Sequence, residues 1–195
     1  MDAADTATVT PSRPRYSPAR TRIITAALEL FSQHGVSGTS LQMIANAIGV
    51  TKAAVYHQFN TKNEIVLAVA EVELARLAAA LEAAEAQECT LQARAVLLTR
   101  VIDLAVERRG VTSVLQTDPV MIRFLAEHEP FQRLLDRLFA VLIGDDADAD
   151  AQVRAAMLSG AIGGAAVHPF VRDLDDETLR THLLNLARRL FQLPD

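Results

Sequence analysis

Apolar side chains recur every three or four residues along most of the chain, which is the helical period, and no strand-like alternation competes with it. The clearest case is the stretch 39–59, in which Leu41, Ile44 and Ile48 share one helical face. Gly49 follows where a turn needs a positive φ angle. This spacing predicts two short helices joined by a tight turn.

The second of these helices has one buried side and one slim side. Thr51 is placed to cap its first turn, and Val55 points toward the core. The small side chains of Ala53 and Ala54 keep the opposite face narrow, so the helix fits a DNA major groove, which is about 12 Å wide. The pattern therefore predicts a DNA-binding helix-turn-helix, and the alternative is a helical hairpin inside an unrelated bundle.

The segment ALELFSQHGVSGTSLQMIANAIGVTKAAVYHQFNTKNEIV resembles the N-terminal domain of tetracycline-repressor (TetR) family regulators. It includes their Tyr-x-x-Phe pair as Tyr56 and Phe59, and their following lysine as Lys62. The resemblance covers roughly residues 18–66; beyond them the chain resembles the family only in length and helical pattern. It implies an all-α protein, with an N-terminal three-helix helix-turn-helix domain and a C-terminal helical ligand-binding and dimerisation bundle.

The resemblance implies that Lys52, Ala53 and Ala54 face base edges and that Tyr56 and His57 contact phosphates. Two alanines offer only apolar contact, for which thymine methyl groups are the natural partners, so discrimination falls to Lys52 or to DNA shape. Hydroxyls at helix starts either hold a phosphate or act as caps alone. The expected DNA contacts are Thr39, Ser40, Gln42, Thr51, Lys52, Ala53, Ala54, Tyr56, His57 and Lys62.

Charge is distributed unevenly along the chain, whose net charge is −5. Residues 11–62 carry six basic groups and one acidic group, while residues 63–195 are acidic overall. A basic head on an acidic body suits a phosphate-binding module joined to a regulatory domain. The alternative is a solvated surface whose charge is uneven by chance.

Composition narrows the class of protein further. The chain has 195 residues, 50% of them hydrophobic, and a single cysteine, Cys89, which excludes an intramolecular disulfide and fits a reducing compartment. No apolar run is long enough to span a membrane, and the first ten residues do not resemble a secretion signal. We therefore expect a soluble, cytoplasmic protein with no membrane partner.

Three regions are expected along the chain. Residues 1–16 read as a disordered arm, from which Arg13 and Arg15 either reach DNA or only solvate the tail. Residues 17–62 form the helix-turn-helix domain, and 63–195 the effector-binding and dimerisation domain. Helix signals in the last region cover 61–87, 91–109, 118–126, 129–144, 151–167 and 176–193, with an acidic linker over 144–151.

The last two expected helices suggest a dimer interface. Small residues four apart allow close helix contact, and the leucine stripe that follows is wider than one core usually covers. Two such helices from each subunit would make a four-helix bundle, which is also how the family dimerises; the alternative is packing inside a monomer. The expected interface residues are Ala156, Gly160, Gly164, Leu179, Leu183, Leu186 and Leu190.

The expected function is a dimeric DNA-binding regulator, more often a repressor than an activator, that binds a pseudo-palindromic operator on double-stranded DNA and is released by a small, mainly apolar effector. The candidate pocket residues, each of which also suits plain core or surface, are Leu104, Gln116, Met121, Phe124, His128, Phe131, Leu135 and Met157. No catalytic or metal-binding motif and no cofactor is expected. The rival hypothesis is an architectural or partner-controlled DNA-binding protein that needs no small molecule.

Overall fold

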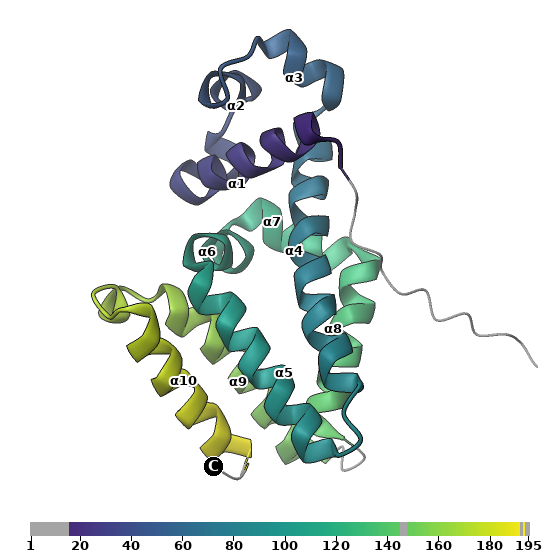
Figure 1. Cartoon of the computed structure of the whole chain (residues 1–195), viewed down its shortest axis with the longest axis vertical. Helices are drawn as coiled ribbons and strands as arrows, with labels where there is room; N and C mark the ends of the chain where they lie inside the picture. Colours follow the sequence, from purple (N-terminus) through teal and green to yellow (C-terminus); the bar gives the residue numbers. More distant parts are fainter. Residues whose placement is uncertain (1–15, 145–147, 192, 194–195) are drawn as a thin grey trace, which may run out of the picture.

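The computed structural model describes residues 16–144, 148–191 and 193, and within these ranges every regular element is a helix (Figure 1). The predicted all-α fold class is confirmed. The helices are α1 (Pro18–Gly38), α2 (Leu41–Ala47), α3 (Lys52–Gln58), α4 (Lys62–Glu85), α5 (Thr90–Glu107), α6 (Arg109–Thr117), α7 (Pro119–Glu127), α8 (Glu129–Ile143), α9 (Ala149–Val167), a 3-10 turn η1 (Pro169–Val171) and α10 (Asp176–Phe191).

The first three helices form a head at one end of the molecule, above the bundle of the remaining helices (Figure 1). Their ends are set by local chemistry: the Ser40 hydroxyl accepts the Met43 N–H, and the Thr51 hydroxyl accepts the Ala54 N–H. Gly49 between them has a φ of +70°, which a residue with a side chain rarely adopts. The predicted helix, turn and helix are confirmed.

Helix α4 connects the head to the bundle. The Thr61 hydroxyl accepts the Glu64 N–H at 3.1 Å, as in a standard capping box. The reciprocal bond differs: the Glu64 carboxylate accepts the N–H of Asn60, at 2.9 Å, which is one residue before the usual donor, Thr61. The 24 residues of α4 give a helix about 36 Å long, at 1.5 Å per residue. One rigid element therefore runs from the head deep into the bundle (Figure 1).

Two predicted boundaries are wrong. The helix expected to stop at Gly110 instead ends at Glu107, and a new helix, α6, begins at Arg109 and contains Gly110. A Cβ atom at Gly110 would lie 3.4 Å from the Ser32 Cβ, so the glycine lets α6 pack closely on α1. The expected acidic linker is shorter than predicted, because Asp148 already caps α9 by accepting the Ala151 N–H; residues 145–147 lie outside the described ranges.

Of the arm expected over residues 1–16, the structure describes only Tyr16. Residues 1–15, with Arg13 and Arg15, lie outside the described ranges, but Tyr16 is anchored: its hydroxyl donates to the Glu71 carboxylate, and its ring packs on the head core. Burial, and then the bond to Glu71, raise the pKa of the Tyr16 hydroxyl. Tyr16 therefore packs as part of the head.

The buried side chains form two clusters. The lower cluster lies among α4, α5, α8, α9 and α10. The upper cluster contains the apolar faces of α1 to α3 and the first half of α4, and also Val114, Met121 and Leu125 from α6 and α7. The head and the bundle thus share a core, and a domain boundary at residue 62 stays a prediction.

A single carboxylate joins α1 to α7. Helix α1 is kinked at Gly35, where φ is +71°, and this kink frees the Val36 N–H from the helix. Asp118 Oδ2 accepts that N–H at 2.7 Å, while Asp118 Oδ1 accepts the Val120 and Met121 N–H groups at the start of α7. A Cβ at Gly35 would lie 3.1 Å from Asp118 Oδ2, so glycine suits this position in both conformation and space.

We predict that Asp118→Ala lowers the free energy of unfolding by about 2–3 kcal/mol, since it removes a helix cap and a partner of a partly buried amide. Asp148→Ala, which removes only the cap of α9, is the matched control and should cost about 1 kcal/mol. Urea denaturation at one protein concentration measures both. Equal losses would show that the bond to Val36 contributes nothing.

Candidate nucleic-acid interface and internal cavity

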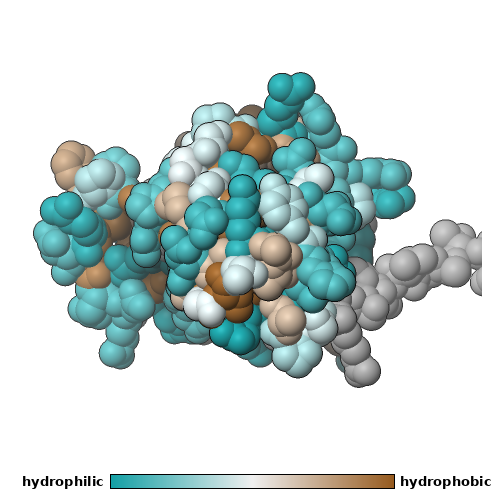
Figure 2. Space-filling view, turned by 90° about the horizontal axis from the view of Figure 1, so that it is seen from above, coloured by the Kyte–Doolittle hydropathy of each residue, from teal (hydrophilic) through white to brown (hydrophobic). Residues whose placement is uncertain are grey.

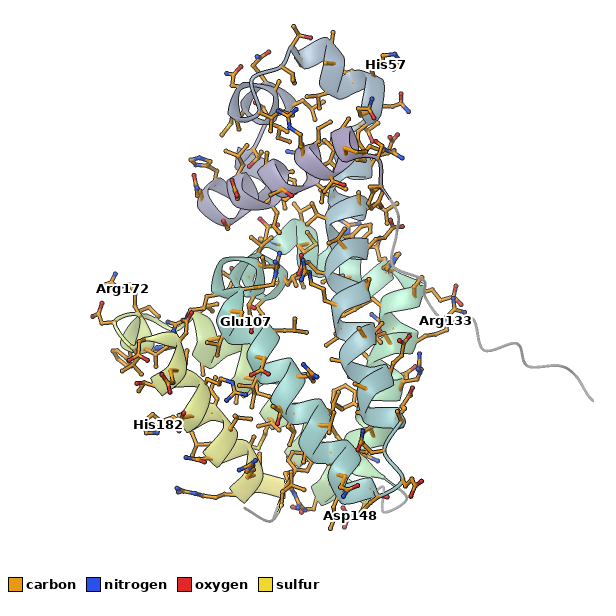
Figure 3. All side chains as sticks on the ribbon, viewed as in Figure 1. His57, Glu107, Arg133, Asp148, Arg172 and His182 are labelled. Atoms are coloured by element: carbon orange, nitrogen blue, oxygen red, sulfur yellow. The ribbon has the colours of Figure 1, made fainter. Side chains whose placement is uncertain are left out.

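Helix α3 presents an exposed face at the end of the molecule farthest from the bundle. Val55 and Phe59 point inward and are almost completely buried. Lys52, Ala53, Ala54 and His57 are exposed. Figure 3 shows His57 projecting from the tip of the head into solvent. The predicted reading helix is therefore free on the side that the sequence analysis assigned to DNA.

The surface around this helix is mainly hydrophilic when viewed from the head end, with only small apolar spots (Figure 2). Tyr56 keeps 44% of its surface exposed, and the Lys52 ammonium lies 5.6 Å from the centre of its ring. Such a cation–π contact keeps the lysine near the start of α3 without neutralising it. The arrangement brings one cation and one phenolic hydroxyl to the same exposed face.

The hydroxyls expected at the phosphates differ in their accessibility. Ser40 and Thr51 are exposed caps of α2 and α3, and Gln42 is exposed with its amide bonded to Asn46. Thr39, by contrast, is only 2% exposed, and its hydroxyl donates to the Gly35 carbonyl. Its side chain serves the kink in α1 and is not available to a phosphate, which corrects the expectation from sequence.

Lys62 also has a partner inside the protein. Its Nζ donates to the carbonyls of Val36, Ser37 and Thr39, at 2.8, 3.4 and 3.0 Å. These carbonyls lie at the end of α1, where a helix leaves its last acceptors unpaired and favours a cation. Lys62 therefore caps α1 in this structure, and its contact with a DNA phosphate stays a prediction.

Two further basic residues of the head also make contacts within the protein. The Arg22 guanidinium donates to the Ile48 carbonyl at the end of α2, and the Arg20 guanidinium lies 4.4 Å from the centre of the Phe59 ring. Lys62, Arg22 and Arg20 of the described head thus each have a contact within the protein, and Arg22 is also exposed to solvent. On α3 itself, Lys52 and His57 both face solvent.

A cavity of about 270 Å³ lies in the bundle, below the head. Helices α4 to α9 all contribute to its wall, which is mostly apolar. Of the eight pocket residues expected from sequence, four line it: Leu104, Gln116, Phe131 and Leu135. Helix α6, which the sequence analysis missed, supplies one side of the wall with Val111, Thr112, Leu115 and Gln116.

The other four expected residues lie elsewhere. Met121 is fully buried in the upper core, and Phe124 stacks on His128, which ends α7. Met157 is 65% exposed on α9. Met121 thus belongs to the core, Phe124 and His128 to the end of α7, and Met157 to the outer surface.

One charged group on the cavity wall was not anticipated. Glu73 of α4 is 8% exposed, and its Oε1 accepts from Arg108 Nη2 at 2.8 Å, while Arg76 Nε lies 3.8 Å from its Oε2. Burial raises the pKa of the Glu73 carboxyl, against the opposing effect of Arg108 and Arg76. A signal was available, because Glu73 interrupts the apolar stripe that Val66, Val69 and Leu77 form on α4.

The expected dimer residues divide into two groups. Ala156 and Gly160 are exposed on α9, and a Cβ at Gly160 or Gly164 would meet no other atom within 4 Å. Leu186 is 60% exposed and Leu190 is also exposed on α10. Leu179 and Leu183, however, are buried in the lower core of the chain itself, which corrects their assignment to an interface with a second chain.

Within residues 16–144, 148–191 and 193, no helix is both long and apolar enough to cross a bilayer. No group of three or more histidine, cysteine or acidic side chains comes together in those ranges as a metal site would need.

Comparison with known proteins agrees with the geometry. Residues 23–69 match the model of a family described as bacterial regulatory proteins, tetR family. The HTH-type transcriptional regulator TcmR of Streptomyces glaucescens is 30% identical over 175 residues, which cover 79% of this chain and 77% of TcmR.

Two other similarities cover different shares. The HTH-type transcriptional repressor AcnR of Corynebacterium diphtheriae is 28% identical over 64% of this chain, and the chain spans only 63% of that repressor. The crystal structure of a bacterial regulatory protein in the tetR family from Rhodococcus RHA1 superposes with a TM-score of 0.72 at 20% identity, covering 92% of this chain and all of that one. This last likeness concerns the fold alone.

We predict different effects for the two lysines of the head. Lys62→Met should lower the free energy of unfolding by about 1–2 kcal/mol, because three carbonyls lose a cationic donor. Lys52→Met should change it by less than about 0.5 kcal/mol, because that ammonium is exposed, but should weaken DNA binding. Urea denaturation and fluorescence anisotropy with labelled duplex DNA measure the two quantities. If Lys62→Met left stability unchanged and weakened DNA binding, Lys62 would be a phosphate contact after all.

Proposed function

The chain belongs to the TetR family of bacterial regulatory proteins, and on this basis we propose that it is a DNA-binding transcriptional repressor that acts as a homodimer and is released from DNA by a small, mainly apolar effector. The observation that carries the proposal is the pairing of an exposed, slim α3 with a ligand-sized cavity in the bundle that supports it.

The reading of DNA falls to α3. Ala53 and Ala54 let the helix approach base edges closely and offer apolar contact to thymine methyl groups. Lys52 and His57 bring positive charge or hydrogen-bond donors to the same face. Because α3 offers so few polar side chains to the bases, sequence-dependent DNA shape contributes part of the preference for one operator sequence over another.

The proposed partner at α9 and α10 is a second copy of the chain. Their outer face carries exposed apolar side chains, Val153 and Met157 on α9 and Leu186 and Leu190 on α10, beside the open positions at Gly160. Small residues allow a close helix approach, and a two-fold axis would make the patch self-complementary. Two heads at a fixed separation read half-sites about 34–36 Å apart, or a multiple of that distance.

The proposed release works through α6. This helix lines the cavity with Thr112 and Gln116 and also packs on α1, and its end leads directly into Asp118. A ligand that pushes on α6 therefore acts on the carboxylate that holds the kink of α1. The resulting change in head position would make DNA and effector exclude each other, with a coupling free energy typically of about 1–3 kcal/mol. A regulator that needs no small molecule, the rival hypothesis, leaves the cavity without a role.

To test the proposal, binding sites are selected from random duplex DNA with the purified protein and footprinted. We expect a pseudo-palindrome whose two halves are both protected. Leu186→Glu, which places a charge on the exposed face of α10, should produce monomers in sedimentation equilibrium and weaken binding to the full site by at least about tenfold. Its affinity for an isolated half-site should be unchanged.

The matched control is Ile122→Glu on α7, where the side chain is 46% exposed, compared with 60% for Leu186. This variant should stay dimeric and retain the wild-type affinity. If Leu186→Glu sediments as a dimer with full affinity, the interface is not on α10; if selection enriches no sequence, the proposed operator recognition fails.

A further inference from the structure

The cavity wall carries an imbalance of charge that points to the chemistry of its ligand. Among the residues that line it, Arg76 and Arg108 are cationic and Glu73 is the acid. With the Glu73 carboxyl ionised, the three side chains sum to one positive charge; with that carboxyl protonated, they sum to two. In either state the wall favours an anion.

The arginines also have unused donors. The Nε–H groups of Arg76 and of Arg108 are buried and have no hydrogen-bond partner in the described part of the chain. The carboxylate of Glu73 is engaged mainly by Arg108 Nη2, at 2.8 Å, and only loosely by Arg76 Nε, at 3.8 Å. A buried donor without a partner is costly, so a second acceptor placed here would gain from bonds that are now unmade.

The rest of the wall defines the remainder of the ligand. Away from these three residues it is built mainly from leucine, valine and phenylalanine side chains of α4, α5 and α8, such as Leu77, Val101 and Phe139. Since an engineered cavity of roughly 150 Å³ takes up benzene, this one, at about 270 Å³, suits a molecule of about ten to twelve non-hydrogen atoms. The single surplus charge matches a monoanion better than a dianion.

We infer that the effector is a medium-length amphiphile with one carboxylate, whose head group binds Arg76 and Arg108 beside Glu73 and whose apolar chain fills the cavity. The inference rests on the proposed function, because it names the ligand of that same site. The inference also gives Arg76 a role. Glu73 and Arg108 already neutralise each other, so the charge of Arg76 is left to bind the carboxylate of the ligand.

The test compares three ligands of equal chain length with the full-length protein by isothermal titration calorimetry below their micelle concentrations. The ligands are decanoate, 1-decanol and decylamine. Decanoate should bind at least about tenfold more tightly than either of the others, since a charge-assisted hydrogen bond is worth about that factor. Equal affinity of 1-decanol, tighter binding of decylamine, or no binding of any of the three would overturn the inference.

Variants locate the head group. Arg76→Gln keeps the Glu73–Arg108 pair and should weaken decanoate about tenfold while leaving 1-decanol unchanged; Arg76→Lys should recover part of the loss. Glu73→Gln, which raises the net positive charge of the cavity wall, should tighten the binding of decanoate and thus tests the same idea from the opposite side.

The matched control is Arg133→Gln on α8, whose side chain points away from the bundle and pairs with Glu129 (Figure 3). If Arg133→Gln weakened decanoate as much as Arg76→Gln, the head group would not be in the cavity.

A second readout separates this inference from the proposed function. Anisotropy with the selected duplex reports whether decanoate also releases DNA. Tight, Arg76-dependent binding of decanoate without release supports the ligand class and contradicts effector control. Release of DNA by 1-decanol as effectively as by decanoate supports effector control and contradicts the carboxylate.

Discussion

The carboxylate of Asp118 fixes the position of helix α1, in the head, relative to helix α7, in the bundle. Its two oxygens accept three backbone N–H groups, two that begin α7 and the Val36 N–H that the kink of α1 sets free. A charged acceptor shared by two helices fixes their relative position more strictly than apolar contact does, because hydrogen bonds are directional. The kink, in turn, sets the direction in which the chain enters α2 and α3, and therefore how the reading helix is presented.

The same junction joins the core of the head to the bundle. Its core is completed by Val114, Met121 and Leu125 of the bundle, and α4 belongs to both parts. Protein interiors are close-packed, so a displacement of α6 or α7 has to be met by a shift in α1. A cavity bordered by α6 is thus well placed to influence a surface at the far end of the head, without any contact between ligand and DNA.

The features that sequence predicted are those with local causes. The caps at Ser40 and Thr51 and the turn at Gly49 depend on neighbours within a few residues, so their residue types indicate their roles. Long-range partners decided the rest. Lys62 looked free for a phosphate, but carbonyls at the end of α1, at least 23 residues earlier in the sequence, accept from its ammonium. Thr39 bonds to Gly35, only four residues before it, but its burial depends on the packing of the whole head.

The errors in the body have the same origin. Gly110 looked like a helix stop, because sequence does not show that α1 lies against it. Leu179 and Leu183 lie on the same stripe as Leu186, and only the packing of α10 on α5 and α9 separates core from surface along that stripe. Glu73 on a buried stripe, with Arg76 three residues further along α4, was a readable signal of a polar site inside the bundle. Its closer partner, Arg108, lies 35 residues away in the sequence and could not be read from that pattern.

Hydrogen exchange at the Val36 amide tests the central claim, that filling the cavity acts on the head through Asp118, most directly. The comparison is between the wild type and Leu135→Trp, whose indole fills the cavity from α8, with tryptophan fluorescence reporting that the ring is buried. The account predicts faster exchange at Val36 in the variant, with amides of α5 as protected as in the wild type, and weaker DNA binding. A buried indole with unchanged exchange at Val36 would contradict it.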